Sequence, residues 1–207
     1  MASIGKITGV NGNLIRVAFV GAVAQNEVAY AKLPSGIKLK SEVIRIRGDY
    51  AELQVFEDTT GLKAGDDVEF TGELLSVELG PGLLGQVFDG LQNPLPRLAE
   101  ECGFFLQRGK YLNALERDQK WAFTPVAKVG DKLTAGETLG TVPEGIFKHR
   151  IMVPFKVRKT VTVEKIMPAG DYTVEDVIAI LKDADGNTVE AKIMQIWPVK
   201  IPIKQYS

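Results

Sequence analysis

Cysteine and histidine, which often serve as nucleophiles, general bases and metal ligands, are nearly absent from this sequence. Cys102 is the only cysteine and His149 the only histidine, which excludes an internal disulfide and any cysteine-based or two-histidine metal site. Catalysis by His149 would require an oriented nucleophile and an orienting acid. We predict instead that Lys148-His149-Arg150 is a solvated turn or part of an interface. No catalytic, metal-binding or cofactor-binding residue is predicted in this chain.

The run GPGLLG, from Gly80 to Gly85, has the glycine spacing of a dinucleotide-binding turn and follows a plausible strand. A dinucleotide fold also needs a crossover helix directly after the glycines. Gly90, Pro94 and Pro96 leave no room for that helix, so the dinucleotide interpretation is disfavoured. The chain also lacks the G-x-x-x-x-G-K-[ST] loop that holds a nucleoside triphosphate. We therefore predict no nucleotide site in this chain.

The stretch VAKVGDKLTAGETLGTV (126–142) resembles the glycine rhythm of biotinyl and lipoyl carrier domains. Those domains present a lysine for covalent attachment at an exposed hairpin tip. Lys148 is the only lysine near the corresponding tip, and it lacks the Met-Lys-Met or Asp-Lys-Ala context of the carriers. We predict a barrel-sandwich fold with an unmodified tip. A stand-alone carrier or a β-barrel binding module stays open as the alternative function.

Charge and hydropathy exclude further classes of function. Lys and Arg number 25 against 26 Asp and Glu, giving a net charge of −1, whereas nucleic-acid binding requires a basic surface. No apolar run reaches the length of a membrane span, and the first residues do not resemble a signal peptide. We predict a cytoplasmic protein that does not bind nucleic acid.

Turn signals between short apolar runs predict a small closed β-barrel over residues 1–72. Asn11-Gly12 indicates one hairpin and Gly48-Asp49 a second. The periodicity contains no helical pattern in this region. Closure of the sheet would also remove edge strands that invite aggregation.

The remaining chain divides into three predicted parts. Residues 73–109 are apolar, rich in glycine and proline, and too hydrophobic for a solvated linker; the run 96–112 predicts one short helix ending near Gly109. Residues 110–190 predict short strands with tight turns, which is the barrel-sandwich domain, and 191–207 form a final apolar segment. The predicted fold class is therefore mainly all-β.

Three stretches together resemble one family. TGELLSVELGPGLLGQVFDGLQNPL (71–95) is similar to the segment after the N-terminal barrel in the catalytic A subunit of V-type and archaeal-type rotary ATPases. The region 104–145, followed by HRIMVP, resembles the insertion of that subunit called the bulge. MQIWPVKIPI (194–203) resembles the run that leads back into its nucleotide-binding domain.

The resemblance implies an N-terminal portion truncated before the nucleotide-binding domain. The complete subunit would bind ATP and magnesium and couple ATP hydrolysis or synthesis to proton or sodium movement. This chain alone would catalyse nothing, because the catalytic motifs of the family lie beyond it. The residues that match the family motif are architectural, a connector turn and a re-entry strand: Gly80, Pro81, Gly82, Gly85, Asp89, Trp197 and Pro198.

The resemblance also implies partners. The barrel would contact B subunits in the head of the complex, and the bulge would contact peripheral-stalk subunits. The complex would be the only link to the membrane. Segments 73–109 and 191–207 would pack on the ATPase domain. Without that domain, we expect the apolar connector to be disordered, self-associated or folded back on the bulge.

Overall fold

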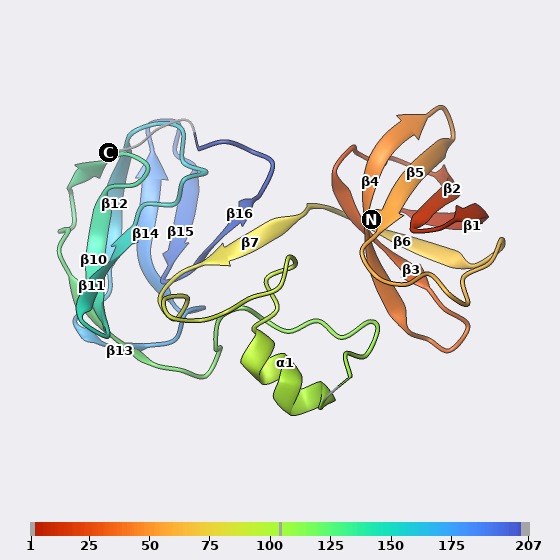
Figure 1. Cartoon of the computed structure of the whole chain (residues 1–207). Helices are drawn as coiled ribbons and strands as arrows, with labels where there is room; N and C mark the ends of the chain where they lie inside the picture. The colour runs from red at the N-terminus through yellow and green to blue at the C-terminus, as the bar shows by residue number, and fades with distance from the viewer. Residues whose placement is uncertain (1–2, 104, 204–207) are drawn as a thin grey trace. The chain divides into compact units, whose positions relative to one another are not determined.

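The computed structural model describes residues 3–103 and 105–203; residues 1–2, 104 and 204–207 of the predicted segments lie outside the described residues. The chain divides into two compact units, each built from two separate stretches of sequence. The first comprises Met1–Leu75 and Leu98–Tyr111, and the second comprises Ser76–Arg97 and Leu112–Ser207. The prediction of a mainly all-β fold with a short helix is confirmed (Figure 1). No helix formed by the described residues is both long and apolar enough to cross a membrane.

The first unit contains the predicted closed barrel. Its strands follow the order β1-β2-β5-β4-β3-β6, and β6 pairs back with β1 to close the sheet. Inward-facing residues alternate in β5, where Ala51, Leu53 and Val55 are buried. The strands are β1 (Ile4–Asn11), β2 (Leu14–Val20), β3 (Glu27–Lys32), β4 (Lys38–Arg47), β5 (Tyr50–Val55) and β6 (Asp67–Leu74).

Both predicted barrel hairpins form. Asn11 pairs with Leu14 across a two-residue turn, so Gly12 and Asn13 are the central residues, one position later than the Asn-Gly signal suggests. Gly12 has φ +60°, a conformation that glycine adopts without steric cost.

The stretch from Leu98 to Tyr111 packs on the barrel as part of the same unit. The Tyr111 hydroxyl accepts the backbone N–H of Lys40 at 2.6 Å, and burial raises the pKa of this hydroxyl well above its ordinary value. The Arg108 guanidinium donates to the carbonyl of Thr60 at 2.6 Å. The predicted connector 73–109 is therefore divided between the two units.

The helix α1 (Leu95–Cys102) is shorter than predicted. The expectation that it ends near Gly109 is wrong, because Gly103 adopts φ +69° and ends the helix at Cys102. The N–H of Gly103 donates to the carbonyl of Ala99 at 2.8 Å, which satisfies an end carbonyl of the helix.

The second unit is a sandwich of two four-stranded sheets that share one hydrophobic core. One sheet has the order β11-β10-β8-β13 and the other β15-β14-β12-β9. Phe123, Leu139, Ile151 and Leu181 are among its fully buried side chains. The strands are β8 (Trp121–Pro125), β9 (Lys132–Leu133), β10 (Thr138–Glu144), β11 (Phe147–Met152), β12 (Val161–Ile166), β13 (Gly170–Tyr172), β14 (Val177–Asp183) and β15 (Thr188–Lys192).

Gly140 in β10 lies where the core leaves no space for a side chain. A Cβ atom at position 140 would overlap the ring of Phe123 and lie 2.7 Å from the carbonyl oxygen of Thr124. We expect Gly140→Ala to lower the free energy of unfolding of the second unit by about 1–3 kcal/mol, because the ring and the neighbouring strand must shift. Denaturant unfolding followed by tryptophan fluorescence measures this.

The readout is specific to the second unit, because both tryptophans of the chain, Trp121 and Trp197, belong to it. Gly90→Ala is the matched control, since a Cβ there meets open space. Equal stability of the two variants would show that the packing at Gly140 tolerates a methyl group.

Candidate functional site

Part of the predicted connector and part of the re-entry segment form a two-stranded sheet in the second unit. Strand β7 (Ser76–Leu79) pairs antiparallel with β16 (Gln195–Pro198), so that Trp197 lies opposite Val77 and Pro198 opposite Ser76. A two-stranded sheet is only marginally stable by itself. Contacts with the rest of the second unit, both polar and apolar, therefore hold the connector in place.

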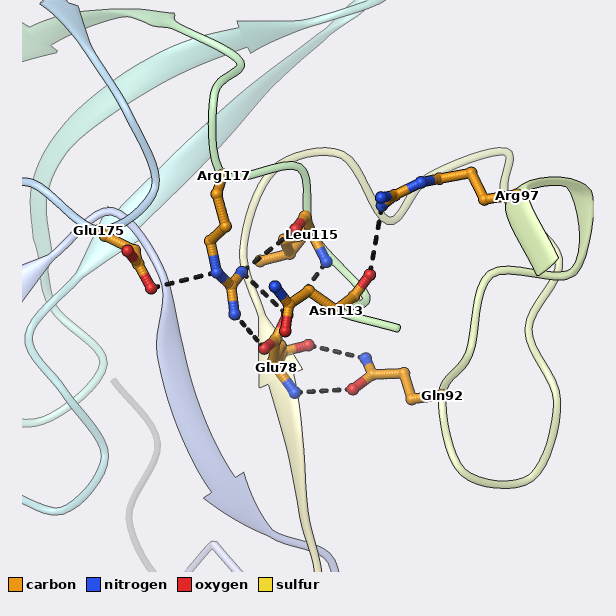
Figure 2. Close-up of polar contacts among 7 residues, drawn as sticks. All are labelled: Glu78, Gln92, Arg97, Asn113, Leu115, Arg117 and Glu175. Atoms are coloured by element: carbon orange, nitrogen blue, oxygen red, sulfur yellow. Dashed lines mark hydrogen bonds and ion pairs between the residues drawn. The ribbon is translucent and has the colours of Figure 1, made fainter. Parts of the chain in front are cut away.

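Glu78 is the centre of these contacts (Figure 2). One carboxylate oxygen accepts the N–H of Leu115 at 3.0 Å and Nη1 of Arg117 at 3.1 Å, and the other oxygen pairs with Nη2 of Arg117. The side chains of Glu78 and Arg117 are only 18% and 22% exposed. Their hydrogen bond raises the pKa of the Arg117 guanidinium, whose Nε also contacts Glu175 at 3.1 Å. This bidentate pair joins β7 to the segment that precedes β8.

Gln92 supports β7 from the side opposite β16. Its side-chain Oε1 accepts the backbone N–H of Glu78 at 2.7 Å, and its Nε2 donates to the carbonyl of Glu78 at 2.8 Å. The primary amide therefore replaces the peptide group of a neighbouring strand (Figure 2). Gln92 itself has φ +64°, a conformation uncommon for a residue other than glycine.

Asp89 closes the loop that presents Gln92. Its Oδ1 accepts the backbone N–H groups of Leu91 and Asn93 at 2.9 and 2.8 Å, and its Oδ2 accepts Nδ2 of Asn93 at 2.8 Å. The amide oxygen of Asn93 in turn accepts the N–H of Leu112 at 2.8 Å. The loop is therefore folded by its own side chains and attached to the start of the sandwich.

Gly80 and Pro81 are buried where the connector leaves β7. A Cβ on Gly80 would lie 3.0 Å from the side chain of Leu115 and 3.2 Å from Met194. Glycine at this position allows the backbone to approach these two side chains closely.

Gly82 is held by a second carboxylate. Its N–H donates to Oε1 of Glu144 at 2.5 Å, and the N–H of Leu84 lies 3.4 Å from the same atom. Gly82 has φ +105°, which a residue with a Cβ would adopt only under strain. Gly85 also has a positive φ, +76°, but a Cβ there would meet open space, so its role is confined to the turn.

Of the two alternatives predicted for Lys148-His149-Arg150, a turn or part of an interface, the turn is wrong. These residues lie in β11, and the turn of the β10–β11 hairpin is formed by Gly145 and Ile146. Nδ1 of His149 lies 2.7 Å from Oε2 of Glu144, while the other oxygen of Glu144 accepts the connector amides. Glu144 is 7% exposed, so its carboxylate interacts with the imidazole and the backbone N–H groups and has little contact with water. This arrangement positions a backbone segment.

Sequence reasoning did not find Glu78, Gln92, Arg117 or Glu144. Glu78 gave a usable signal, because it is an acid within the apolar strand LLSVEL. Each of these groups is satisfied by another part of the unit, so they fix the connector. Among the described residues, no three His, Cys, Asp or Glu side chains gather closely enough to hold a metal ion.

Two family models match the two units. The model described as "ATP synthase alpha/beta family, beta-barrel domain" matches residues 7–72, and "ATPsynthase alpha/beta subunit barrel-sandwich domain" matches residues 112–200. A barrel followed by a barrel sandwich with an anchored connector is thus the class of protein that the fold defines. The chain belongs to the ATP synthase alpha/beta family.

Similar relatives are V-type ATP synthase alpha chains. The chain is 61% identical to that of Treponema denticola over 203 residues, which cover 98% of this chain and 34% of the relative. It is 54% identical to alpha chain 1 of Treponema pallidum, with the same coverage, and 51% identical to the alpha chain of Borreliella burgdorferi, covering 100% of this chain and 36% of the relative. The chain thus spans about a third of the length of these relatives and corresponds to their N-terminal region.

The Glu78–Arg117 pair predicts a measurable stability effect. We expect Glu78→Gln to lower the free energy of unfolding of the second unit by about 1–3 kcal/mol, because it removes a charge-assisted bidentate contact and leaves Arg117 half-buried with less compensation. Denaturant unfolding monitored by tryptophan fluorescence gives the value. Glu164→Gln is the matched control, because its pair with Lys182 is exposed and should contribute little. Similar losses in both variants would contradict an anchoring role for Glu78.

Proposed function

We propose that this chain supplies the barrel and sandwich portion of the alpha chain of a V-type ATP synthase. The barrel joins the barrels of neighbouring B subunits and holds the head of the complex together, and the sandwich contacts the peripheral stalk. The complete complex couples ATP hydrolysis or synthesis, with magnesium, to proton or sodium transport, and lies on the cytoplasmic side of the membrane. This chain contributes assembly geometry and resistance to torque.

The single observation that carries this proposal is identity of 51–61% to V-type ATP synthase alpha chains over essentially the whole chain. The polar anchors around Glu78 and Glu144 support it, because they bind backbone groups within the unit. A scaffold that transmits force requires a connector with a fixed geometry.

A stand-alone carrier is the rival function, and the hairpin geometry disfavours it. The tip of the β10–β11 hairpin presents Ile146, which is 93% exposed. Lys148 lies within β11, opposite Pro143, and the turn residues are not lysines. Intact-mass measurement of the chain from its native host tests this: an added biotinyl or lipoyl group on Lys148 would favour the carrier over the scaffold.

A segment exchange tests the scaffold role directly. Residues 1–203 of this chain replace the matching region of the Treponema denticola alpha chain, and the chimera is expressed with the other subunits of that complex. We expect an assembled complex with ATP hydrolysis close to that of the unmodified complex, because the exchanged region holds surfaces for assembly. Native mass spectrometry and steady-state hydrolysis are the measurements.

The same exchange with the Borreliella burgdorferi segment, which is 51% identical to this chain, is the matched control. Assembly of the control but failure of a folded chimera would contradict the proposal. Calorimetry on the chain alone should show no saturable ATP binding, since the scaffold role assigns it no nucleotide site. Micromolar affinity for ATP would also contradict it.

A further inference from the structure

The edge of the sandwich at β11 has an unpaired backbone. β11 is the end strand of its four-stranded sheet, and in the described part of the chain only β10 pairs with it. An end strand offers N–H and C=O groups on its outer side to another strand. The register of β11 against β10 determines which of its backbone groups face outward.

In the register of β11 against β10, Lys148 lies opposite Pro143. In an antiparallel pair, opposite residues alternate between those that exchange hydrogen bonds and those that do not. Proline has no N–H, so the Lys148 pair is of the second kind, and the Arg150 pair two residues later is as well. Both residues therefore direct their N–H and C=O groups to the free edge.

The same two residues carry the charge of the edge. Lys148 and Arg150 are exposed, and no carboxylate in the described residues lies within ion-pairing distance of either. Arg150 has a long contact of 3.5 Å from Nη2 to the carbonyl of Gly136. The nearby acid Glu144 is buried and engaged with His149 and the connector. This edge is therefore locally basic, although the whole chain has a net charge of −1.

The hairpin tip extends the edge with an apolar contact. Ile146 is 93% exposed and Phe147 is 57% exposed, directly before Lys148 in the sequence. A strand that paired with Lys148 and Arg150 would continue past these two side chains. The outward backbone groups, the two positive charges and the exposed apolar side chains thus lie next to one another along β11 and its hairpin tip.

We propose that the outer edge of β11 binds an extended, acidic segment of a partner protein by strand addition. The partner carries carboxylates at alternate positions, which face Lys148 and Arg150, and an apolar residue that contacts Phe147. Strand addition takes its affinity from main-chain hydrogen bonds and its specificity from alternate side chains. Cations on an open edge also discourage pairing between two identical chains, so the charge selects an acidic strand.

The test uses the full chain and a labelled probe peptide, acetyl-Thr-Glu-Val-Glu-Val-Glu-Thr-amide, with fluorescence anisotropy as the readout. We expect saturable binding that weakens with added salt. Reversing both charges in the K148E/R150E variant should weaken binding roughly tenfold or more, because two ion pairs become two repulsions. Hydrogen exchange should show protection of the Lys148 and Arg150 amides on binding.

Two controls separate strand addition from general attraction. The K132E/K165E variant carries the same charge change on exposed lysines of β9 and β12, and it should bind as the unmodified chain does. A peptide with N-methylated backbone amides keeps every side chain but cannot pair as a strand, so it should not bind. Denaturant unfolding confirms that each variant is folded.

Several results would overturn the proposal. Equal binding of the N-methylated peptide would show surface attraction without strand pairing. Equal weakening by K132E/K165E would place the binding elsewhere. Absence of binding by any peptide would reject an acidic strand, and binding of phosphatidylglycerol vesicles in place of the peptide would make the edge a lipid contact.

Discussion

The connector is fixed by two carboxylates that bind backbone N–H groups within the sandwich unit. Glu78 accepts the N–H of Leu115 at 3.0 Å, and Glu144 accepts the N–H of Gly82 at 2.5 Å. Hydrogen bonds between a charged group and a backbone amide are stronger than neutral ones, and they strengthen further when water is excluded. The pairing of β7 with β16 depends on this support, because two strands alone are marginal.

The anchors also explain why the glycines of this segment are required. Gly80 lets the backbone approach Leu115 and Met194, and Gly82 adopts the positive φ at which its N–H reaches Glu144. The sequence of this segment resembles a phosphate-binding turn, but the N–H of Gly82 donates to Glu144 of the same unit. The ligand of this glycine turn is a carboxylate of the sandwich.

The barrel, the sandwich and the short helix followed from local signals in the sequence. Turn residues at Gly12 and Gly48 and alternating apolar residues report structure within a few positions, so they predict strands well. The contacts around Glu78 join residues that lie 14 to 39 positions apart, and no local pattern encodes such partners. Family resemblance singled out Gly80, Gly82 and Asp89, but it did not give the partners that the structure shows for them.

Local signals also failed where tertiary structure decided the outcome. Lys148-His149-Arg150 looked like a turn because it is polar, but the register places the turn at Gly145 and Ile146. Glu144 lies at the end of β10, and its carboxylate contacts Nδ1 of His149 across the hairpin. The polar residues Lys148-His149-Arg150 therefore lie within strand β11. The helix ended early for a different reason, the positive φ of Gly103.

The interleaved composition of the two units has a consequence for biosynthesis. Residues Met1–Leu75 complete the six strands of the barrel, but the stretch that packs on it, Leu98–Tyr111, leaves the ribosome only after the connector has been made. Until Leu98–Tyr111 has been synthesised, the barrel surface that this stretch covers stays exposed. At the same time Ser76–Arg97 lacks the sandwich strands with which it will pack. The first unit is therefore completed only after Ser76–Arg97, which belongs to the second unit, has been synthesised.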